Sequence, residues 1–208
     1  VIGRAVASGI LSVGVHQLRD YTTDKHRKID ERPYGGGPGM VYRPEPVVAA
    51  VEAVRRPGAR VLIMSPQGRL FDDTLARELA AEKQLVIISG RYEGYDERIV
   101  ELTGAEEVSI GDFILSGGEL AALVVLDAAA RFLPGVLGSE ESALCDSFQA
   151  GLLEGPQYTR PEVYRGLEVP EVLRCGDHER IRKWRQEQAR LRTGLRRAGA
   201  QPAGNKHT

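Results

Sequence analysis

Short apolar runs alternate with amphipathic stretches through the middle of the chain. The runs at 60–64 and 85–88 have the length and the β-branched composition of buried strands. A third strand is predicted over 107–115, which is rich in Val, Ile and Phe although its apolar and polar positions alternate poorly. Residues 65–68, Ser-Pro-Gln-Gly, predict a turn after the first of these strands.

Three helices are predicted around these strands. Pro44-Glu45-Pro46 opens the first, over 47–56, and Pro-Gly at 57–58 ends it. Asp72 or Asp73 can cap the second, which runs to about residue 82 with two leucines on one face. The third, over 119–132, is apolar on most sides, so we expect it to be buried, against the protein itself or a partner subunit.

Alternating strands and helices are typical of a parallel α/β sheet. Ligands of such sheets bind outside the carboxyl ends of the strands. Here those ends are followed by loops at 65–66, 90–93 and 111–118. We therefore expect these three loops to converge on a binding site at one edge of the sheet.

Glycine is concentrated in two loops, 32–40 and 109–119. A residue without a Cβ reaches positive φ without strain and lets the backbone approach a ligand closely. These loops predict a site that is built largely from backbone groups.

The chain changes character after residue 157. Residues 158–175 contain two prolines and no clear period, and a basic helix is predicted from Asp177, its N-cap, to about residue 195, with Ile181, Trp184 and Leu191 as its apolar points. We expect a first domain over 1–157, a linker over 158–175 and a small helical domain over 176–208, whose tail from 198 is polar and predicted to be disordered.

Charge is balanced over the whole chain and unbalanced in its last part. The formal net charge is −1, yet residues 174–197 contain nine basic and three acidic side chains. This asymmetry favours a polyanionic partner, and a solvated charged helix face is an equally good interpretation. The longest apolar stretch, near 120–133, is interrupted by charges and too short for a bilayer, so no membrane partner is expected. Two isolated cysteines favour a cytoplasmic location.

Common catalytic motifs are absent from the sequence. There is no phosphate-binding GxxxxGK[ST] loop, no GxGxxG that follows a strand, no GxSxG elbow and no metal-ligand spacing among the four histidines. Arg131, at the end of an apolar helix, needs a partner or a task. A structural ion pair with Asp146 is the simpler interpretation of the spacing alone.

Several segments, in order, resemble one known family. They are 30–40, 65–69, 90–98, 109–119, 131–138, 146–148 and 158–161. Over about residues 3–197 the chain resembles the bacterial tRNA (guanine-N1)-methyltransferases of the SPOUT class, the TrmD family. Relative to that family we expect an N-terminal strand before Gly3 to be missing and the C-terminal domain to be short.

The resemblance implies a fold, a reaction and a methyl donor. The fold would be an α/β parallel sheet with a deep trefoil knot, and the reaction would transfer a methyl group to N1 of guanosine 37, beside the anticodon of tRNA. The donor would be S-adenosylmethionine. The residues implied to bind it are Met64, Ser65, Pro66, Gly90, Tyr92, Glu93, Ile110, Gly111, Asp112, Phe113, Ile114, Leu115, Gly117 and Gly118.

The resemblance also implies catalytic and substrate residues. Asp146 would be the general base that removes the N1 proton, and Arg131 its partner in the site. Substrate contacts would come from Asp30, Tyr34, Arg160, Arg182 and Arg185. The enzyme would be a homodimer with shared active sites, helped by Mg²⁺, for which the sequence shows no dedicated cation site.

Two other functions remain open at this point. A catalytically silent RNA-binding module would need no donor pocket, and the intact glycines of the 90–93 and 111–118 loops argue against it. A knotted methyltransferase acting on ribose 2′-OH or on ribosomal RNA is the second. The 30–40 loop and the 146–148 segment favour the tRNA guanine-N1 enzyme instead.

Overall fold

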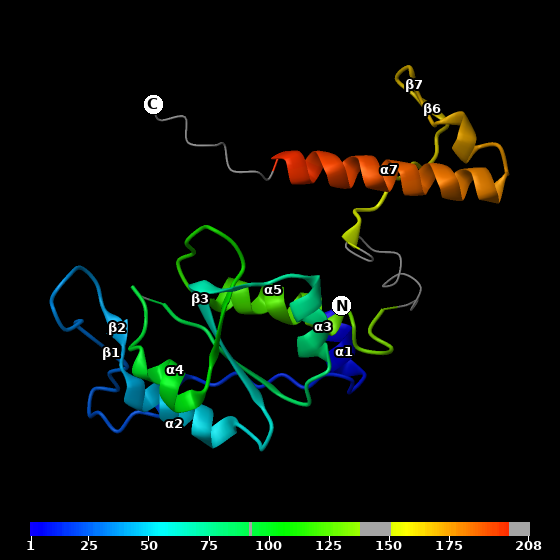
Figure 1. Cartoon of the computed structure of the whole chain (residues 1–208). Helices are drawn as coiled ribbons and strands as arrows, with labels where there is room; N and C mark the ends of the chain where they lie inside the picture. The colour runs from blue at the N-terminus through cyan, green and yellow to red at the C-terminus, as the bar shows by residue number, and fades with distance from the viewer. Residues whose placement is uncertain (92, 138–150, 200–208) are drawn as a thin grey trace, which may run out of the picture. The chain divides into compact units, whose positions relative to one another are not determined.

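The computed structural model describes residues 1–91, 93–137 and 151–199, with side chains through 196. It divides into two compact units, Val1–Gly138 and Ser139–Thr208. Figure 1 shows their helices and strands, and each unit is described by itself.

A three-stranded parallel sheet forms the centre of the first unit. Strand β3 (Arg60–Leu70) lies between β4 (Leu85–Ile88) and β5 (Glu106–Ser109), and both pairings are parallel. The three predicted strands and the parallel α/β sheet are therefore confirmed. The third strand is shorter than predicted, because it ends at Ser109 and the chain then turns into the second glycine loop.

The turn predicted at 65–68 is wrong, because these residues lie inside β3. Met64 and Arg69 both pair with Val108 of β5, so the four residues between them bulge out of the ladder and the strand then resumes. A Cβ on Gly68 would lie 2.2 Å from the carbonyl carbon of Glu107 and 2.3 Å from the nitrogen of Val108. Only glycine fits this approach of one backbone to another.

Side chains of β3 alternate between two helical layers. Val61 and Ile63 pack in one cluster with α2 (Pro44–Val54) and α4 (Arg98–Thr103). Leu62 and Met64 pack in the other, with α3 (Asp73–Ala80) and α5 (Glu119–Ala130). The sheet is thus covered on both faces (Figure 1), which is why its central strand is apolar at successive positions.

Local signals account for the helix boundaries. Asp72 caps α3 by accepting a hydrogen bond from the Leu75 N–H at 2.9 Å, and Pro44 occupies the first turn of α2. The predicted leucine face of α3 is confirmed, since Leu75 and Leu79 are 0% and 1% exposed. Helix α4 was not predicted from the sequence; it has six residues, and its C-cap, Gly104, has a φ of 65°.

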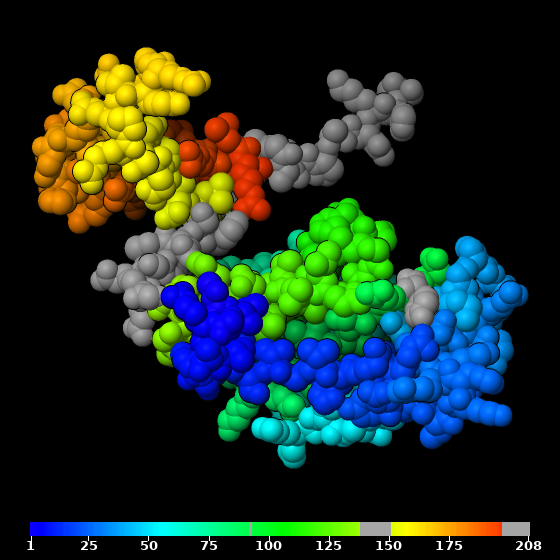
Figure 2. All heavy atoms as spheres, turned by 180° about the vertical axis from the view of Figure 1, so that it is seen from behind, coloured from blue at the N-terminus to red at the C-terminus, as the bar shows by residue number. Residues whose placement is uncertain are grey.

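The N-terminal part of the first unit is mostly extended. It contains α1 (Ile2–Ala7), the 3-10 helix η1 (Leu18–Asp20) and an antiparallel pair, β1 (Asp30–Glu31) with β2 (Val41–Tyr42). Figure 2 shows this segment, in dark blue, crossing the surface of the unit. The first glycine loop, between β1 and β2, therefore belongs to the same unit as the sheet.

The second unit is built on one long helix, α7 (His178–Gly199). The predicted N-cap is confirmed, since Asp177 Oδ1 accepts hydrogen bonds from the N–H groups of Glu179 and Arg180, each at 3.0 Å. Of the predicted apolar points on this helix, Leu191 is exposed, whereas Ile181 and Trp184 are half-buried. The tail from 200 lies outside the described residues.

The segment before α7 contains regular secondary structure, although its sequence shows no helical or strand periodicity. Residues 158–175 contain the hairpin of β6 (Val163–Tyr164) and β7 (Leu167–Glu168), followed by η3 (Glu171–Leu173). Upstream of them, the Leu153 N–H donates to Thr193 Oγ1 at 2.9 Å. Leu153, which the sequence assigned to the first domain, thus contacts α7 within the second unit.

Candidate functional site

The loops after β4 and β5 meet beside the middle of β3. The Gly118 N–H donates to the Gly90 carbonyl at 2.6 Å. A Cβ on Gly118 would lie 3.0 Å from the Gly90 nitrogen and 3.2 Å from Met64 Cβ. The loop after β4, the loop after β5 and the middle of β3 at Met64 therefore lie close together, and Gly118 permits this approach because it has no Cβ.

The loop after β5 is a tight, backbone-bonded turn. Buried Ser109 accepts a hydrogen bond on Oγ from the Gly111 N–H at 3.2 Å, and the Phe113 N–H donates to the Gly111 carbonyl at 3.0 Å. Gly111 has a φ of 143°, and a Cβ there would lie 2.6 Å from the Phe113 ring. Glycine at 111 thus fixes where the following apolar side chains lie.

The apolar side chains of this loop form a half-buried pair and an exposed pair. Ile110 and Leu115 are half-buried and pack against the core cluster between the sheet, α3 and α5. Phe113 and Ile114 are 53% and 80% exposed, and Asp112 is also exposed. The loop therefore offers an accessible apolar surface beside glycine backbone, which is the composition of a site for a flat, partly polar ligand.

The loop after β4 is held by Tyr42. The Tyr42 N–H donates to the Gly94 carbonyl at 3.0 Å, and the Tyr42 carbonyl accepts from the Asp96 N–H at 3.1 Å. The buried Tyr42 hydroxyl accepts from the Arg91 N–H at 3.2 Å. The sequence did not single out Tyr42; its only signal is its position between the first glycine loop and α2.

The first glycine loop reaches the same place. The Glu93 N–H donates to the Met40 carbonyl at 3.1 Å, and a Cβ on Gly39 would lie 2.1 Å from Glu93 Cγ. Tyr34, at the tip of this loop, is fully exposed, and Asp30 is half-buried in β1. The structure thus brings Glu93, predicted for the donor, beside the loop predicted for the substrate.

An ion pair joins the β4 loop to α5. Arg91 Nε lies 2.7 Å from Glu119 Oε1, and this hydrogen bond holds the pKa of Glu119 below its usual value. Both side chains are exposed. A Cβ on Gly117 would lie 3.3 Å from Arg91 Cγ, so Gly117 also leaves room for this pair.

A polar cluster that the sequence did not single out lies behind these loops. Tyr95 and Gln67 both donate to Glu107 Oε1, the latter at 2.6 Å. Burial, and then the bond to the Glu107 carboxylate, raise the pKa of Tyr95 to about 12. The bond from Tyr95, followed by that from Gln67, holds the pKa of Glu107 below its usual value.

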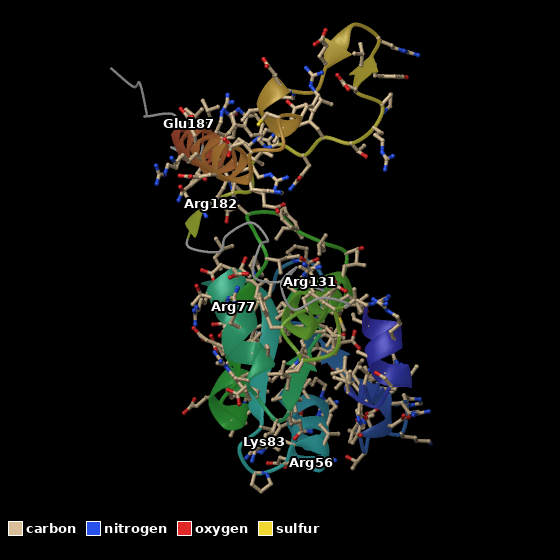
Figure 3. The ribbon with its side chains drawn as sticks, turned by 90° about the vertical axis from the view of Figure 1, so that its right-hand side faces the viewer. Arg56, Arg77, Lys83, Arg131, Arg182 and Glu187 are labelled. Atoms are coloured by element: carbon tan, nitrogen blue, oxygen red, sulfur yellow. The ribbon has the colours of Figure 1, made fainter. Side chains whose placement is uncertain are left out.

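Arg131 lies at the far end of α5 from the donor loops. Gly118 is the N-cap of this helix and Arg131 is its C-cap. Twelve residues separate the caps, and at about 1.5 Å per residue the helix is about 18 Å long. Figure 3 shows Arg131 there and Arg77 on α3, whose guanidinium carbon lies 4.2 Å from the centre of the Phe132 ring.

The remaining predicted residues lie in the second unit or outside the described residues. Arg160 precedes the β6–β7 hairpin and is exposed. Arg182 (labelled in Figure 3) and Arg185 are exposed on α7. Tyr92 and Asp146 fall outside the described residues.

The described residues contain neither a metal-binding cluster nor a membrane-spanning helix. In the ranges 1–91, 93–137 and 151–199, no group of three or more acidic, histidine or cysteine side chains is arranged to hold a metal ion. None of the helices in the part of the chain that the structure describes has the length and apolar character needed to cross a membrane.

Comparison with known proteins identifies the family. The family model described as tRNA (Guanine-1)-methyltransferase TrmD matches residues 1–201. The chain belongs to this TrmD family. A tRNA (guanine-N(1)-)-methyltransferase of Geobacter metallireducens is 56% identical over 191 residues, which are 91% of this chain and 78% of the relative. The protein of the same name from Myxococcus xanthus is 53% identical over 201 residues, 95% of this chain and 81% of that relative.

Membership of the TrmD family agrees with the resemblance identified from the segments. The family model matches nearly the whole chain and not the glycine loops alone. The relatives are methyltransferases by name.

Proposed function

We propose that this protein transfers a methyl group from S-adenosylmethionine to N1 of guanosine 37 in tRNA, in the cytoplasm. The observation that carries the proposal is the close approach of Gly118 to Gly90 and Met64, which brings the loops after β4 and β5 together beside β3 in one backbone-lined site. TrmD relatives that are more than half identical bear the name of this activity. The proposed fold is the knotted SPOUT sheet with a small C-terminal helical domain.

The donor residues fit S-adenosylmethionine in kind. The molecule has a flat adenine, a ribose and a charged sulfonium, and it would supply an electrophilic methyl group when bound. Exposed Phe113 and Ile114, with half-buried Ile110 and Leu115, would cover its adenine, and the glycine backbone would bond its polar edges. The buried hydroxyl of Ser65 and the exposed Glu93 would complete the polar side of the site.

The acceptor requires a base, because guanine N1 carries a proton at neutral pH. Asp146 would take that proton, and Arg131 would orient the guanine and stabilise the negative charge that develops on O6. A carboxylate is a weak base in water, so we propose that Asp146 is desolvated once tRNA is bound.

A homodimer with shared sites would explain the position of Arg131. About 18 Å of helix separates Arg131 from Gly118 in one chain. Leu120, Leu123 and Val124 on α5 are 59%, 53% and 48% exposed in the single subunit, which suits burial against a second copy. The Arg131 end of one subunit would then complete the donor loops of the other.

The second unit would bind the tRNA backbone. The basic side chains of α7, Arg182 and Arg185 among them, are exposed and would contact phosphates, which position an RNA without reading its sequence. Tyr34 and Asp30 would contact bases near the anticodon, because the loop that carries Tyr34 adjoins the donor loops through Glu93.

The direct test is methyl transfer to paired transcripts. Labelled S-adenosylmethionine is incubated with an unmodified tRNA transcript that has guanosine at 36 and 37, and with the same transcript carrying adenosine at 37. We expect label only in the first, recovered as 1-methylguanosine. Label in the adenosine transcript would instead indicate a methyltransferase for another RNA site, and no label with intact donor binding would refute the tRNA substrate.

Asp146→Asn tests the general base. We expect methyl transfer to fall by a factor of about 10² or more, the usual contribution of a positioned base, while donor binding is retained. Near-normal turnover of this variant would refute the assignment.

A further inference from the structure

One carboxylate links the three loops of the candidate site from behind. Glu107 lies on β5, two residues before Ser109, and its Oε1 accepts from Tyr95 of the β4 loop and from Gln67 of the β3 bulge. Together Gln67, Tyr95 and Glu107 form what we call the Glu107 cluster. Each member comes from a different strand or the loop that follows it.

The bulge makes this link necessary. Between Met64 and Arg69 the ladder from β3 to β5 is interrupted. The side chain of Gln67 bridges the interruption, since its Nε2 lies 2.6 Å from Glu107 Oε1. Bulges re-aim side chains and are frequent beside active sites, and this one includes Ser65 of the candidate donor site.

Tyr95 provides the second link, to the β4 loop. Its two neighbours in sequence, Gly94 and Asp96, are both bonded through the backbone to Tyr42. The backbone of Tyr95 is therefore fixed, and its hydroxyl sets the spacing between this loop and β5.

The protonation states of the cluster are constant near neutral pH. The raised pKa of Tyr95 and the lowered pKa of Glu107 keep the phenol protonated and the carboxylate ionised. A hydrogen bond from a neutral donor to an ionised acceptor is shorter and stronger than one between neutral groups. Gln67 is exposed, while Tyr95 and Glu107 are half-buried.

We propose that Tyr95 and Gln67, acting through Glu107, are positioning residues that hold the three donor loops at the spacing S-adenosylmethionine requires. This inference rests on the proposed function. No member of the cluster touches the reacting atoms in this role, so its loss raises the KM for the donor and leaves kcat nearly unchanged.

The test measures binding of S-adenosylhomocysteine, a stable probe of the donor site, by calorimetry, together with donor KM, kcat and Tm. Tyr95→Phe removes one hydroxyl and weakens probe binding about tenfold, the value of one bond to a charged group. Gln67→Ala, at an exposed position that folding tolerates, weakens it about threefold. Glu107→Gln keeps an acceptor oxygen but loses the charge, so it weakens probe binding less than Glu107→Ala, which loses about tenfold or more.

Thr103→Val is the matched control. It removes a buried hydroxyl that donates to the Ile99 carbonyl at 2.6 Å within α4, away from the loops. It lowers Tm and leaves probe affinity and donor KM unchanged.

The inference is overturned if Tyr95→Phe and Gln67→Ala bind the probe as tightly as wild type, whatever their Tm. Should Tyr95→Phe not fold, the Gln67→Ala result decides. A wild-type protein that binds the probe but methylates no tRNA refutes the proposed substrate alone. A wild-type protein that does not bind the probe refutes both proposals.

Discussion

Gly118 and Arg131 cap the two ends of the same helix, α5, so the tightest contact of the donor loops and the predicted catalytic arginine lie about 18 Å apart in one subunit. A single subunit cannot bring them to one methyl group without unfolding the helix between them. The consequence is testable with two variants that are each defective.

Mixed dimers of Gly118→Val and Arg131→Ala should recover activity. Each variant alone is expected to lose methyl transfer, the first through the donor loops and the second through the acceptor side. Each shared site takes its donor loops from one subunit and its Arg131 from the other. In a mixed dimer, one site therefore contains both substitutions and the other contains neither. Unfolding and refolding the two together, then assaying methyl transfer, should restore up to about a quarter of wild-type activity, because about half of the dimers are mixed and each mixed dimer has one intact site; activity no higher than that of the separate variants would contradict shared sites.

Gly118→Ala should weaken donor binding more than it destabilises the fold. The new Cβ would lie 3.0 Å from the Gly90 nitrogen and 3.2 Å from Met64 Cβ and Ser89 Cα, so the loops must move apart. We expect S-adenosylmethionine affinity to fall about tenfold, which is about 1.4 kcal/mol, as measured by calorimetry.

Gly3→Ala is the control for that measurement. Its Cβ would meet nothing within 4 Å and it lies in α1. Its donor affinity should equal that of wild type, and an equal loss in both variants would show that the effect does not come from the loops.

Gly68→Ala should destabilise the first unit. Its Cβ would lie 2.2 Å from the Glu107 carbonyl carbon. This backbone atom cannot move aside as the end of a flexible side chain could. Overpacking of this kind costs about 1–3 kcal/mol of unfolding free energy, which urea denaturation monitored by circular dichroism can measure. A midpoint equal to that of wild type would mean that β3 and β5 do not approach this closely in solution.

Acid should weaken the fold partly through Glu78. Hydrogen bonding by Arg69, followed by pairing with Arg60, lowers the pKa of Glu78 from the ordinary 4.5. A group with a lowered folded-state pKa stabilises the protein above its unfolded pKa, and that stabilisation is lost as pH falls through the folded value. Urea midpoints should therefore fall below about pH 4.5, and less steeply in Glu78→Gln; parallel curves would assign the acid sensitivity to other carboxylates.

Arg182→Ala and Arg185→Ala should weaken tRNA binding without affecting the donor. Each would remove one phosphate contact, so the slope of log affinity against log salt should decrease by about 1 per variant. Filter binding over a range of KCl concentrations measures this slope. Lys83→Ala removes an exposed charge from the first unit and should leave the slope unchanged (Figure 3).

Much of the first unit could be predicted from the sequence, because its signals are local. An apolar run of the right length predicts a buried strand whatever lies beside it, and β4 has the predicted bounds. Asp72 needs only the next turn of its own helix to act as a cap. The parallel strand order then implied that the 65–66, 90–93 and 111–118 loops would meet, and Gly118 and Gly90 do.

Only the tertiary structure decided how those loops are held. The bulge in β3 appears when Met64 and Arg69 pair with the same residue of β5, and no periodicity within β3 encodes a register with another strand. Tyr42, Tyr95 and Glu107 are unremarkable in sequence, since a hydrogen bond between residues far apart in the chain leaves no local pattern. The sequence by itself determined which residues could form a backbone-lined site, because backbone freedom and burial are properties of each segment; the strand register decided which of them touch, because contact depends on how separate segments pack.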